Sequence, residues 1–173
     1  MRIIQIPEYQ SDSIKKVITD LSFPWYYNPG TLFDNSFRDK HQWVHTLVRD
    51  GKIDSSYFES IFHIIRPFIP EFETHFLYRS KINCNTPYKR RESILPHIDD
   101  HTRKGSVSYI YYVHDSDGPT RIYENWWRTI KVNPKQGRLL RFASDTRHSG
   151  NIPYKFETRT VINFVFFSKP DID

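Results

Sequence analysis

A succession of short strand-like segments after residue 72 is the feature that most constrains how this chain can fold. The segments are rich in β-branched and aromatic residues, and turn signals such as Asp117-Gly118-Pro119 and Asn133-Pro134 separate them. The predicted strands are Phe72–Asn83, Ile94–Asp99, Ser106–His114, Thr120–Glu124, Thr129–Val132, Arg138–Phe142 and Arg159–Phe167. About seven short strands at close spacing predict a sandwich or a barrel-like jelly roll. The aromatic content of 16% suits such a strand-rich core.

The first 70 residues have a different periodicity. Apolar residues at helical spacing predict a helix over 11–22, with Ser11 or Ser13 as its cap, and a second helix that follows Asp54 and ends before Pro67. No repeat or linker divides the sequence. We therefore expect a single domain over 1–173, mainly β, in which 1–70 is a helical support region and 71–173 is a jelly-roll core.

Composition limits the setting and the partners. No apolar run approaches the length of a membrane helix, and the first ten residues do not resemble a secretion signal. Cys84 is the single cysteine, so no internal disulfide forms and an intracellular, cytoplasmic location is expected. The net charge of +5 favours anionic partners only weakly, and a scattered basic surface explains it equally well.

The stretch SILPHIDDHT contains His97 and Asp99 in a His-x-Asp pattern. In an extended chain, residues i and i+2 project to the same side, so both side chains can bind one metal ion. The alternative is a polar loop that contains them by chance. Two histidines and one carboxylate on one face are typical of non-haem Fe(II) oxygenases. The stretch from Gly137 to Phe167 offers the second histidine, His148, followed by Arg159 at the start of an apolar strand.

The ordered pattern His97-x-Asp99, His148, Arg159 resembles the Fe(II)/2-oxoglutarate-dependent dioxygenases, and within them the prolyl 4-hydroxylase-like group. The resemblance extends over roughly residues 75–168. Further matching segments are Ile110–Val113, Gly118–Tyr123, Val132–Phe142 and the Arg159-x-x-x-Asn163 pattern. It implies a double-stranded β-helix (jelly roll) with two supporting N-terminal helices.

The resemblance also implies a division of labour within the site. Fe(II) is expected to bind His97, Asp99 and His148, and to leave three positions open for 2-oxoglutarate and oxygen. Arg159 is expected to hold the far carboxylate of 2-oxoglutarate, because a guanidinium matches a carboxylate in bidentate fashion. The alternative role for Arg159 is an ordinary surface salt bridge, for example with Glu157.

Further contacts to the cosubstrate are expected from three polar side chains. Asn163 shares a strand face with Arg159, and Tyr112 is preferred over Tyr111, which would point the other way. The alternative role of Tyr112 is core packing. The choice between Asn83 and Asn85 stays open, with Asn85 as the candidate.

Other polar residues nearby are expected to lie outside the site. His101 and His114 are interpreted as loop residues, and Asp100 should point away from Asp99. Cys84 is expected to pack in its strand.

The resemblance implies that oxygen decarboxylates 2-oxoglutarate to succinate and CO2 while a C–H bond of the substrate is hydroxylated, with ascorbate as a possible reductant. A peptidyl proline is the favoured substrate, and a nucleic acid or a small metabolite is the alternative. The nucleic-acid branch usually has a second arginine on the last strand, which TVINFVFFSK lacks. Substrate contacts are expected from residues 26–52 and 85–93, with Trp126 and Trp127 on another rim. A non-catalytic binding module is the competing class, and a closed zinc site is disfavoured because it would need more cysteines.

Overall fold

The structure, a computed structural model, describes residues 1–30, 41–87, 94–100, 102–125 and 127–169. Within these residues the strands form two antiparallel sheets. The large sheet contains β1 (Arg2–Gln5), β2 (Tyr26–Asn28), β3 (Gln42–Arg49), β4 (Lys52–Ile53), β5 (His75–Asn85), β6 (Val107–Tyr112), β9 (Arg138–Ala143) and β11 (Arg159–Ser168). The small sheet contains β7 (Thr120–Tyr123), β8 (Thr129–Val132) and β10 (His148–Gly150).

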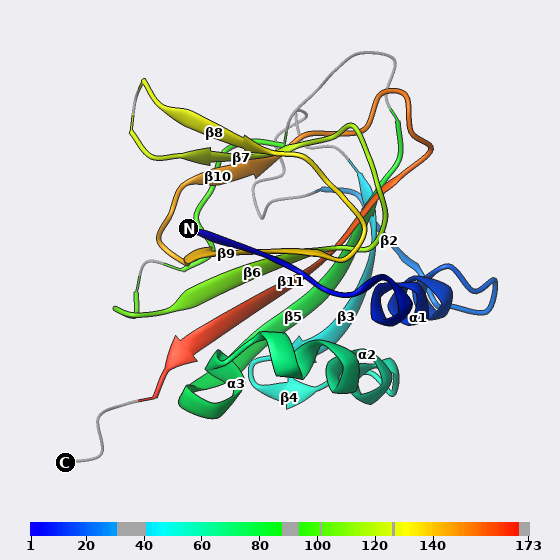
Figure 1. Ribbon diagram of the computed structural model, residues 1–173, viewed down its shortest axis with the longest axis horizontal. Helices are drawn as coiled ribbons and strands as arrows, with labels where there is room; N and C mark the ends of the chain where they lie inside the picture. The colour runs from blue at the N-terminus through cyan, green and yellow to red at the C-terminus, as the bar shows by residue number, and fades with distance from the viewer. Residues whose placement is uncertain (31–40, 88–93, 101, 126, 170–173) are drawn as a thin grey trace.

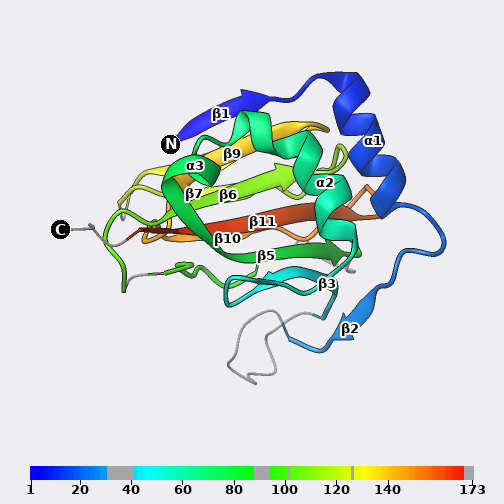
Figure 2. The same ribbon diagram turned by 90° about the horizontal axis from the view of Figure 1, so that it is seen from below.

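The elements are arranged in three layers. The large sheet has the order β1-β9-β6-β11-β5-β3-β2, with β4 paired to β3, and the small sheet has the order β10-β7-β8. The small sheet lies over one face of the large sheet, and the helices cover the other face (Figure 1). These helices are α1 (Glu8–Ile18), α2 (Tyr57–Ile65), the 3-10 turn η1 (Arg66–Phe68) and α3 (Glu71–Thr74). Figure 2 views the molecule from below and shows α2 and α3 in front of the strands of the large sheet.

The main hydrophobic core lies between the helices and the large sheet. The apolar face of α2 buries Phe58, Ile61 and Ile65, while α1 adds Ile14 and Ile18. The even-numbered side chains of β11, and the odd-numbered ones of β6, meet these helices because neighbouring residues of a strand point to opposite faces. The side chains on the opposite face of the same strands point toward the small sheet.

A buried polar brace fastens α3 to the large sheet. Glu71 accepts a hydrogen bond from the Tyr109 hydroxyl, and Arg141 Nη2 lies 2.6 Å from Glu71 Oε1. Burial opposes ionisation of Glu71, but the hydrogen bonds from Tyr109 and Arg141 outweigh it and lower the pKa of the carboxyl. The carboxylate is therefore charged and satisfied within the fold.

A second, smaller core lies between the two sheets. Its largest side chains are Tyr112 and Phe142, which pack with Ile110 and Val161 from the large sheet and Ile122 from the small one. This cluster closes one side of the space between the sheets. The polar residues discussed below occupy the rest of that space.

The mainly β jelly roll with N-terminal helices confirms the predicted fold class. The predicted helical support region, residues 1–70, also contributes strands β1 to β4 to the large sheet. The first helix begins at Glu8 after Pro7, with no side-chain cap, so the predicted capping by Ser11 or Ser13 is wrong. Ser11 lies inside the helix, and its hydroxyl donates a hydrogen bond to the Glu8 carbonyl.

Two predicted strands differ from the structure. Ile94–Asp99 is not a continuous strand, because only His97 pairs, through an isolated bridge with His148. The segment Phe72–Asn83 begins as the short helix α3, and β5 starts at His75. Among the described residues, no helix is both long and apolar enough to cross a bilayer.

Candidate metal centre and cosubstrate pocket

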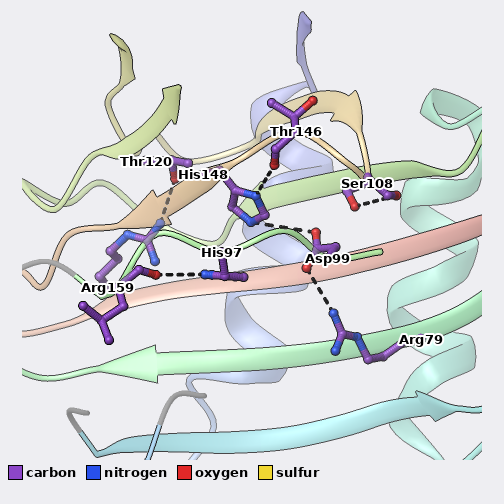
Figure 3. A network of polar contacts seen from close by, with 10 residues as sticks. Arg79, His97, Asp99, Ser108, Thr120, Thr146, His148 and Arg159 are labelled. Atoms are coloured by element: carbon purple, nitrogen blue, oxygen red, sulfur yellow. Dashed lines mark hydrogen bonds and ion pairs between the residues drawn. The ribbon is translucent and has the colours of Figure 1, made fainter. Parts of the chain in front are cut away.

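His97, Asp99 and His148 converge between the two sheets. One candidate donor atom from each lies within 4.8 Å of the other two, and His148 Nε2 is 3.8 Å from Asp99 Oδ2. His97 and His148 exchange backbone hydrogen bonds of 2.9 and 2.8 Å, which holds their rings 4.5 Å apart. The Asp99 N–H donates to the Ser144 carbonyl at 3.1 Å. Backbone pairing therefore positions all three side chains, which lie close together in Figure 3.

The other ring nitrogen of each histidine contacts a backbone carbonyl. His97 Nδ1 lies 3.1 Å from the Leu95 oxygen, and His148 Nδ1 lies 3.0 Å from the Thr146 oxygen. A carbonyl only accepts, so each Nδ1 carries a proton, and in a neutral ring Nε2 then keeps its lone pair. A metal-binding histidine needs this tautomer, and such outer contacts commonly fix it.

The electrostatic environment favours neutral His148. Burial lowers the pKa of His148, and the nearby His97 lowers it further, while the Asp99 carboxylate opposes both effects. A neutral imidazole is the form that binds a metal ion. The site thus offers one ring nitrogen from each histidine and one carboxylate oxygen.

Asp99 has a second partner on β5. Arg79 Nη2 donates to Asp99 Oδ1 at 3.1 Å, whereas Asp99 Oδ2 faces His148. The two carboxylate oxygens are therefore used differently, and Arg79 fixes the rotation of the carboxylate. Arg79 and Arg159 lie on opposite sides of the triad (Figure 3).

Arg159 is fully buried at the other side of the triad. Its Nε donates to the Gly118 carbonyl at 2.7 Å, and Nη2 donates to Thr120 Oγ1 at 2.8 Å. No carboxylate pairs with it among the residues that the structure describes, so the predicted alternative of an ion pair with Glu157 is not what the structure has. Burial lowers the pKa of the guanidinium, yet arginine stays charged at neutral pH. An unpaired buried charge calls for an anion.

Two glycines make room around the Arg159 side chain. A Cβ on Gly150 would lie 3.2 Å from Arg159 Nη1, and one on Gly118 would lie 2.9 Å from Arg159 Cδ and 2.3 Å from the Asn151 oxygen. Nη1 therefore borders the space that the missing Gly150 side chain leaves. Both glycines allow the guanidinium to face the cavity.

Tyr112 lies beside Arg159. Its hydroxyl donates to Thr120 Oγ1 at 2.7 Å, and its ring centroid is 5.9 Å from Arg159 Cζ. Burial raises the pKa of Tyr112, so the phenol is neutral. The neighbouring Tyr111 belongs to the core on the helix side of the sheet. Thr120 joins Tyr112 and Arg159 into one network.

Buried amides line the same cavity. Asn85 pairs in register with Arg159, and Asn83 follows on the same face of β5. Both polar atoms of Asn85, and the Oδ1 atoms of Asn83 and Asn163, are buried without a hydrogen-bond partner. Unpartnered buried amides are uncommon, and a bound ligand is one explanation for them.

A cavity of about 530 Å³ connects these groups. Its lining includes the triad, Arg159 and the amides, together with Ile110 and Val161. This volume is in the usual range for a small-molecule site. A larger depression of about 1260 Å³ lies between α1 and residues 155–158, but no residue of the triad lines it.

The residues interpreted as outside the site lie apart from it where they are described. Asp100 accepts hydrogen bonds from Thr102, and His114 contacts Thr158 and Thr160. Cys84 is buried in β5. His101, Trp126 and parts of the predicted substrate loops (31–40 and 88–93) lie outside the described residues.

Several contributors to the site were not predicted, namely Arg79, Lys81, Thr120, Gly118 and Gly150. The signal for the first two was present in the sequence, because Arg79, Lys81, Asn83 and Asn85 alternate along one strand. The glycines carry no such signal, since their role depends on where Arg159 lies in space.

The fold is shared with several solved oxygenase structures. A prolyl hydroxylase from Trichoplax adhaerens, solved with a peptide fragment of the hypoxia inducible factor oxygen degradation domain, matches 96% of this chain and 83% of its own, at 19% identity and a TM-score of 0.67. A 2OG-Fe(II) oxygenase family oxidoreductase from Burkholderia pseudomallei matches 95% and 84%, at 16% identity and a TM-score of 0.71. A Pseudomonas putida prolyl-4-hydroxylase matches 97% and 92%, at 12% identity and a TM-score of 0.61.

No protein-family model and no curated protein sequence matches the chain. The structural similarities therefore define the class by its fold. The chain has the double-stranded β-helix fold of the 2-oxoglutarate- and Fe(II)-dependent oxygenases, with a His-Asp-His group between its sheets.

Proposed function

We propose that this chain is an Fe(II)- and 2-oxoglutarate-dependent dioxygenase that hydroxylates a C–H bond of its substrate. One observation carries the proposal. The His97, Asp99 and His148 group shares a cavity with the buried guanidinium of Arg159, which has no carboxylate partner among the described residues. A site of this kind can chelate one end of 2-oxoglutarate at a metal and neutralise the other end.

The donor set fits Fe(II). Two imidazoles, each with Nδ1 held by a backbone carbonyl, and one carboxylate leave coordination positions for other ligands. Structural zinc sites, by contrast, usually close with four protein ligands, often cysteine. The single cysteine, Cys84, lies buried in β5 and is not part of this group.

The opposite end of the cavity fits a carboxylate. Arg159 presents a charged fork whose Nε and Nη2 are held by Gly118 and Thr120, and the space beside Nη1 is kept open by Gly150. Tyr112 supports this arrangement through Thr120. A guanidinium held in place in this way suits the far carboxylate of 2-oxoglutarate.

The unpartnered amides supply the remaining polar contacts. Asn85 lies opposite Arg159 in the β5–β11 register, and Asn163 projects from the same face of β11 as Arg159. The Nδ2 group of each can donate to the carboxylates of the bound cosubstrate, since an ionised carboxylate only accepts. The apolar side chains of Ile110 and Val161 line the same space and keep water from part of it.

When bound, iron, 2-oxoglutarate and oxygen supply the oxidation: the cosubstrate becomes succinate and CO2, and one oxygen atom is added to a C–H bond of the substrate. The residues of the chain bind and orient the participants and exclude water. A buried lone cysteine is in keeping with a reducing, cytoplasmic setting.

We further propose a peptidyl proline as the substrate. Two of the structural neighbours are prolyl hydroxylases, one of them in complex with a peptide, and each aligns over at least 96% of this chain. The last strand ends in TVINFVFFSK without the second arginine of the nucleic-acid branch. These two observations favour a peptide over a nucleic acid.

The test is release of succinate from 2-oxoglutarate by purified protein in air with proline-containing peptides. We expect release that needs Fe(II), rises with a suitable peptide and is lost in Asp99→Ala. Asp100→Ala, which alters the adjacent carboxylate outside the triad, should retain it. Release that persists in Asp99→Ala at the wild-type rate would remove the triad from the proposal.

A further inference from the structure

The side of the cavity away from Arg159 is basic. Arg79 and Lys81 line it from β5, on the same strand face as Asn83 and Asn85. Arg79 is engaged by Asp99, but Lys81 has neither a hydrogen bond nor an ion pair among the described residues. Among the described residues, Lys81 is therefore the free cation on this side of the cavity.

The surroundings of Lys81 increase its need for an anion. Burial lowers the pKa of its ammonium, and the positive charges of Arg79 and Arg49 lower it further. Arg49 pairs with Asp54 at the surface, and Arg79 pairs with Asp99, so each of these carboxylates already has a cationic partner other than Lys81. A partly buried ammonium without a carboxylate partner is stabilised by a bound negative group.

Amide oxygens without partners lie close to Lys81. Asn163 is its partner in the β5–β11 register, and Asn83 is two residues along the same face. The Oδ1 atoms of both are buried and accept no hydrogen bond within the structure. These oxygens can accept from N–H groups, such as those of a peptide backbone, beside an anion at Lys81.

A smaller hollow of about 260 Å³ shares Arg79 and Asp99 with the main cavity and is also lined by Asp100, Thr102 and Arg103. Its two arginines and two aspartates balance in charge. Among the described residues, the unpaired positive charge on this side of the cavity therefore stays at Lys81.

We propose that the primary substrate is an acidic peptide whose side-chain carboxylate binds Lys81 next to the position that is oxidised, while Asn83 and Asn163 accept hydrogen bonds from its amides. This inference rests on the proposed function, because it assigns Arg159 to the cosubstrate and leaves Lys81 for the substrate. A carboxylate suits the site better than a phosphate, since one lysine and neutral amides line it and Arg79 is already paired.

The test observes Lys81 directly. Lysines of the Zn(II)-loaded protein, which cannot turn over, are reductively methylated with ¹³C and followed by NMR at constant ionic strength with saturating 2-oxoglutarate. The Lys81→Gln variant identifies the Lys81 signal, and Lys131→Gln, an exposed lysine of β8, is the matched control. The probes are acetate, its neutral analogue acetamide, and inorganic phosphate.

We expect acetate to shift the Lys81 signal saturably in the presence of 2-oxoglutarate, with no shift from acetamide and an unchanged response in Lys131→Gln. Lack of a shift, an equal shift with acetamide, or loss of the acetate effect when 2-oxoglutarate is added would overturn the inference. The last result would mean that the cosubstrate itself occupies Lys81. A shift with phosphate at more than tenfold lower concentration than acetate would overturn the carboxylate assignment.

Calorimetry on the same samples separates this inference from the proposed function. Binding of 2-oxoglutarate without an acetate effect at Lys81 contradicts the inference alone. An acetate effect without any binding of 2-oxoglutarate contradicts both the proposed function and the division of the cavity on which the inference rests.

Discussion

His97 and His148 face each other across an isolated antiparallel bridge, in which each backbone N–H donates to the carbonyl of the other residue. The bridge joins the segment before β6 to the start of β10. It brings the two imidazole rings together, and the Asp99 backbone N–H bonds nearby to the Ser144 carbonyl. The three donors are thus positioned by the fold itself, which is how a rigid site binds a metal with little reorganisation.

Asp99→Ala should abolish metal-dependent stabilisation while leaving the metal-free fold intact. A metal that binds only the folded state raises the melting temperature, and at a given concentration the rise grows with the logarithm of its affinity. We expect added Fe(II), or Co(II) under the same conditions, to raise the melting temperature of the wild type and of Asp100→Ala, but not of Asp99→Ala. Thermal unfolding measures these melting temperatures. An equal rise in all three proteins would place the metal site elsewhere.

Arg159→Ala should weaken the binding of 2-oxoglutarate much more than the binding of the metal ion. Removing one partner of a buried charge pair costs about 2–5 kcal/mol, so we expect the dissociation constant to rise at least thirtyfold. Arg159→Lys should not restore the affinity, because an ammonium cannot reproduce the fork held by Gly118 and Thr120. Calorimetric titration of the Zn(II) protein measures this, with exposed Arg128→Ala as the control. Wild-type affinity in Arg159→Ala would place the carboxylate site elsewhere.

Gly150→Ala tests the space beside the guanidinium. The added methyl group would lie 3.2 Å from Arg159 Nη1, so the arginine or its ligand must move. Crowding of this kind costs about 1–3 kcal/mol, and we expect 2-oxoglutarate to bind roughly tenfold more weakly. Metal affinity, measured in the same protein, should not change because the triad is untouched. An unaltered cosubstrate affinity would show that the ligand does not approach this side of Arg159.

Glu71→Gln should destabilise the protein in a pH-dependent manner. At pH 7 the change weakens hydrogen bonds to Tyr109 and Arg141, and we expect the free energy of unfolding to fall by about 1–3 kcal/mol. The folded state lowers the pKa of Glu71, so this stabilisation is present above the unfolded-state pKa and is lost as the pH falls through the lower folded-state value. Urea unfolding from pH 7 to pH 3 should show the wild type approaching the variant.

The control for this brace is Glu73→Gln, which removes an exposed carboxylate from the same short helix. It should change the unfolding free energy at pH 7 much less than Glu71→Gln. A constant difference between wild type and Glu71→Gln at every pH would show that the variant acts through packing and not through the charge.

The strand faces of several candidate site residues could be predicted from the sequence, because they depend on short spacings, whereas His148 and the role of each residue came from the resemblance to a family. His97 and Asp99 are two residues apart, and Arg159 opens a long apolar strand, so their faces follow from the strand period alone. The same period placed Tyr112 and Asn163 on the face of the sheet opposite to Tyr111. These placements need no knowledge of which strands are neighbours.

The rest depended on contacts between distant segments. The bridge between His97 and His148 replaced the predicted strand Ile94–Asp99, because only one residue of that segment finds a pairing partner. Strand β1 has four residues and pairs with β9, more than 130 positions away, so nothing local marks it as a strand. The ion pair between Arg79 and Asp99 was likewise not predicted, because it joins β5 to a segment that lies beside it only in the folded chain. Long-range pairing is settled by packing and not by local propensity.

We expect the triad and Arg159 to bind one chelated ligand together, and an anaerobic titration measures this binding. Fe(II) is added to the protein and then 2-oxoglutarate, while the weak visible charge-transfer absorption of a chelated complex is followed. We predict a band in the wild type that Asp99→Ala lacks and that Arg159→Ala forms only at much higher 2-oxoglutarate. No band in a folded wild-type protein that binds iron would contradict the account.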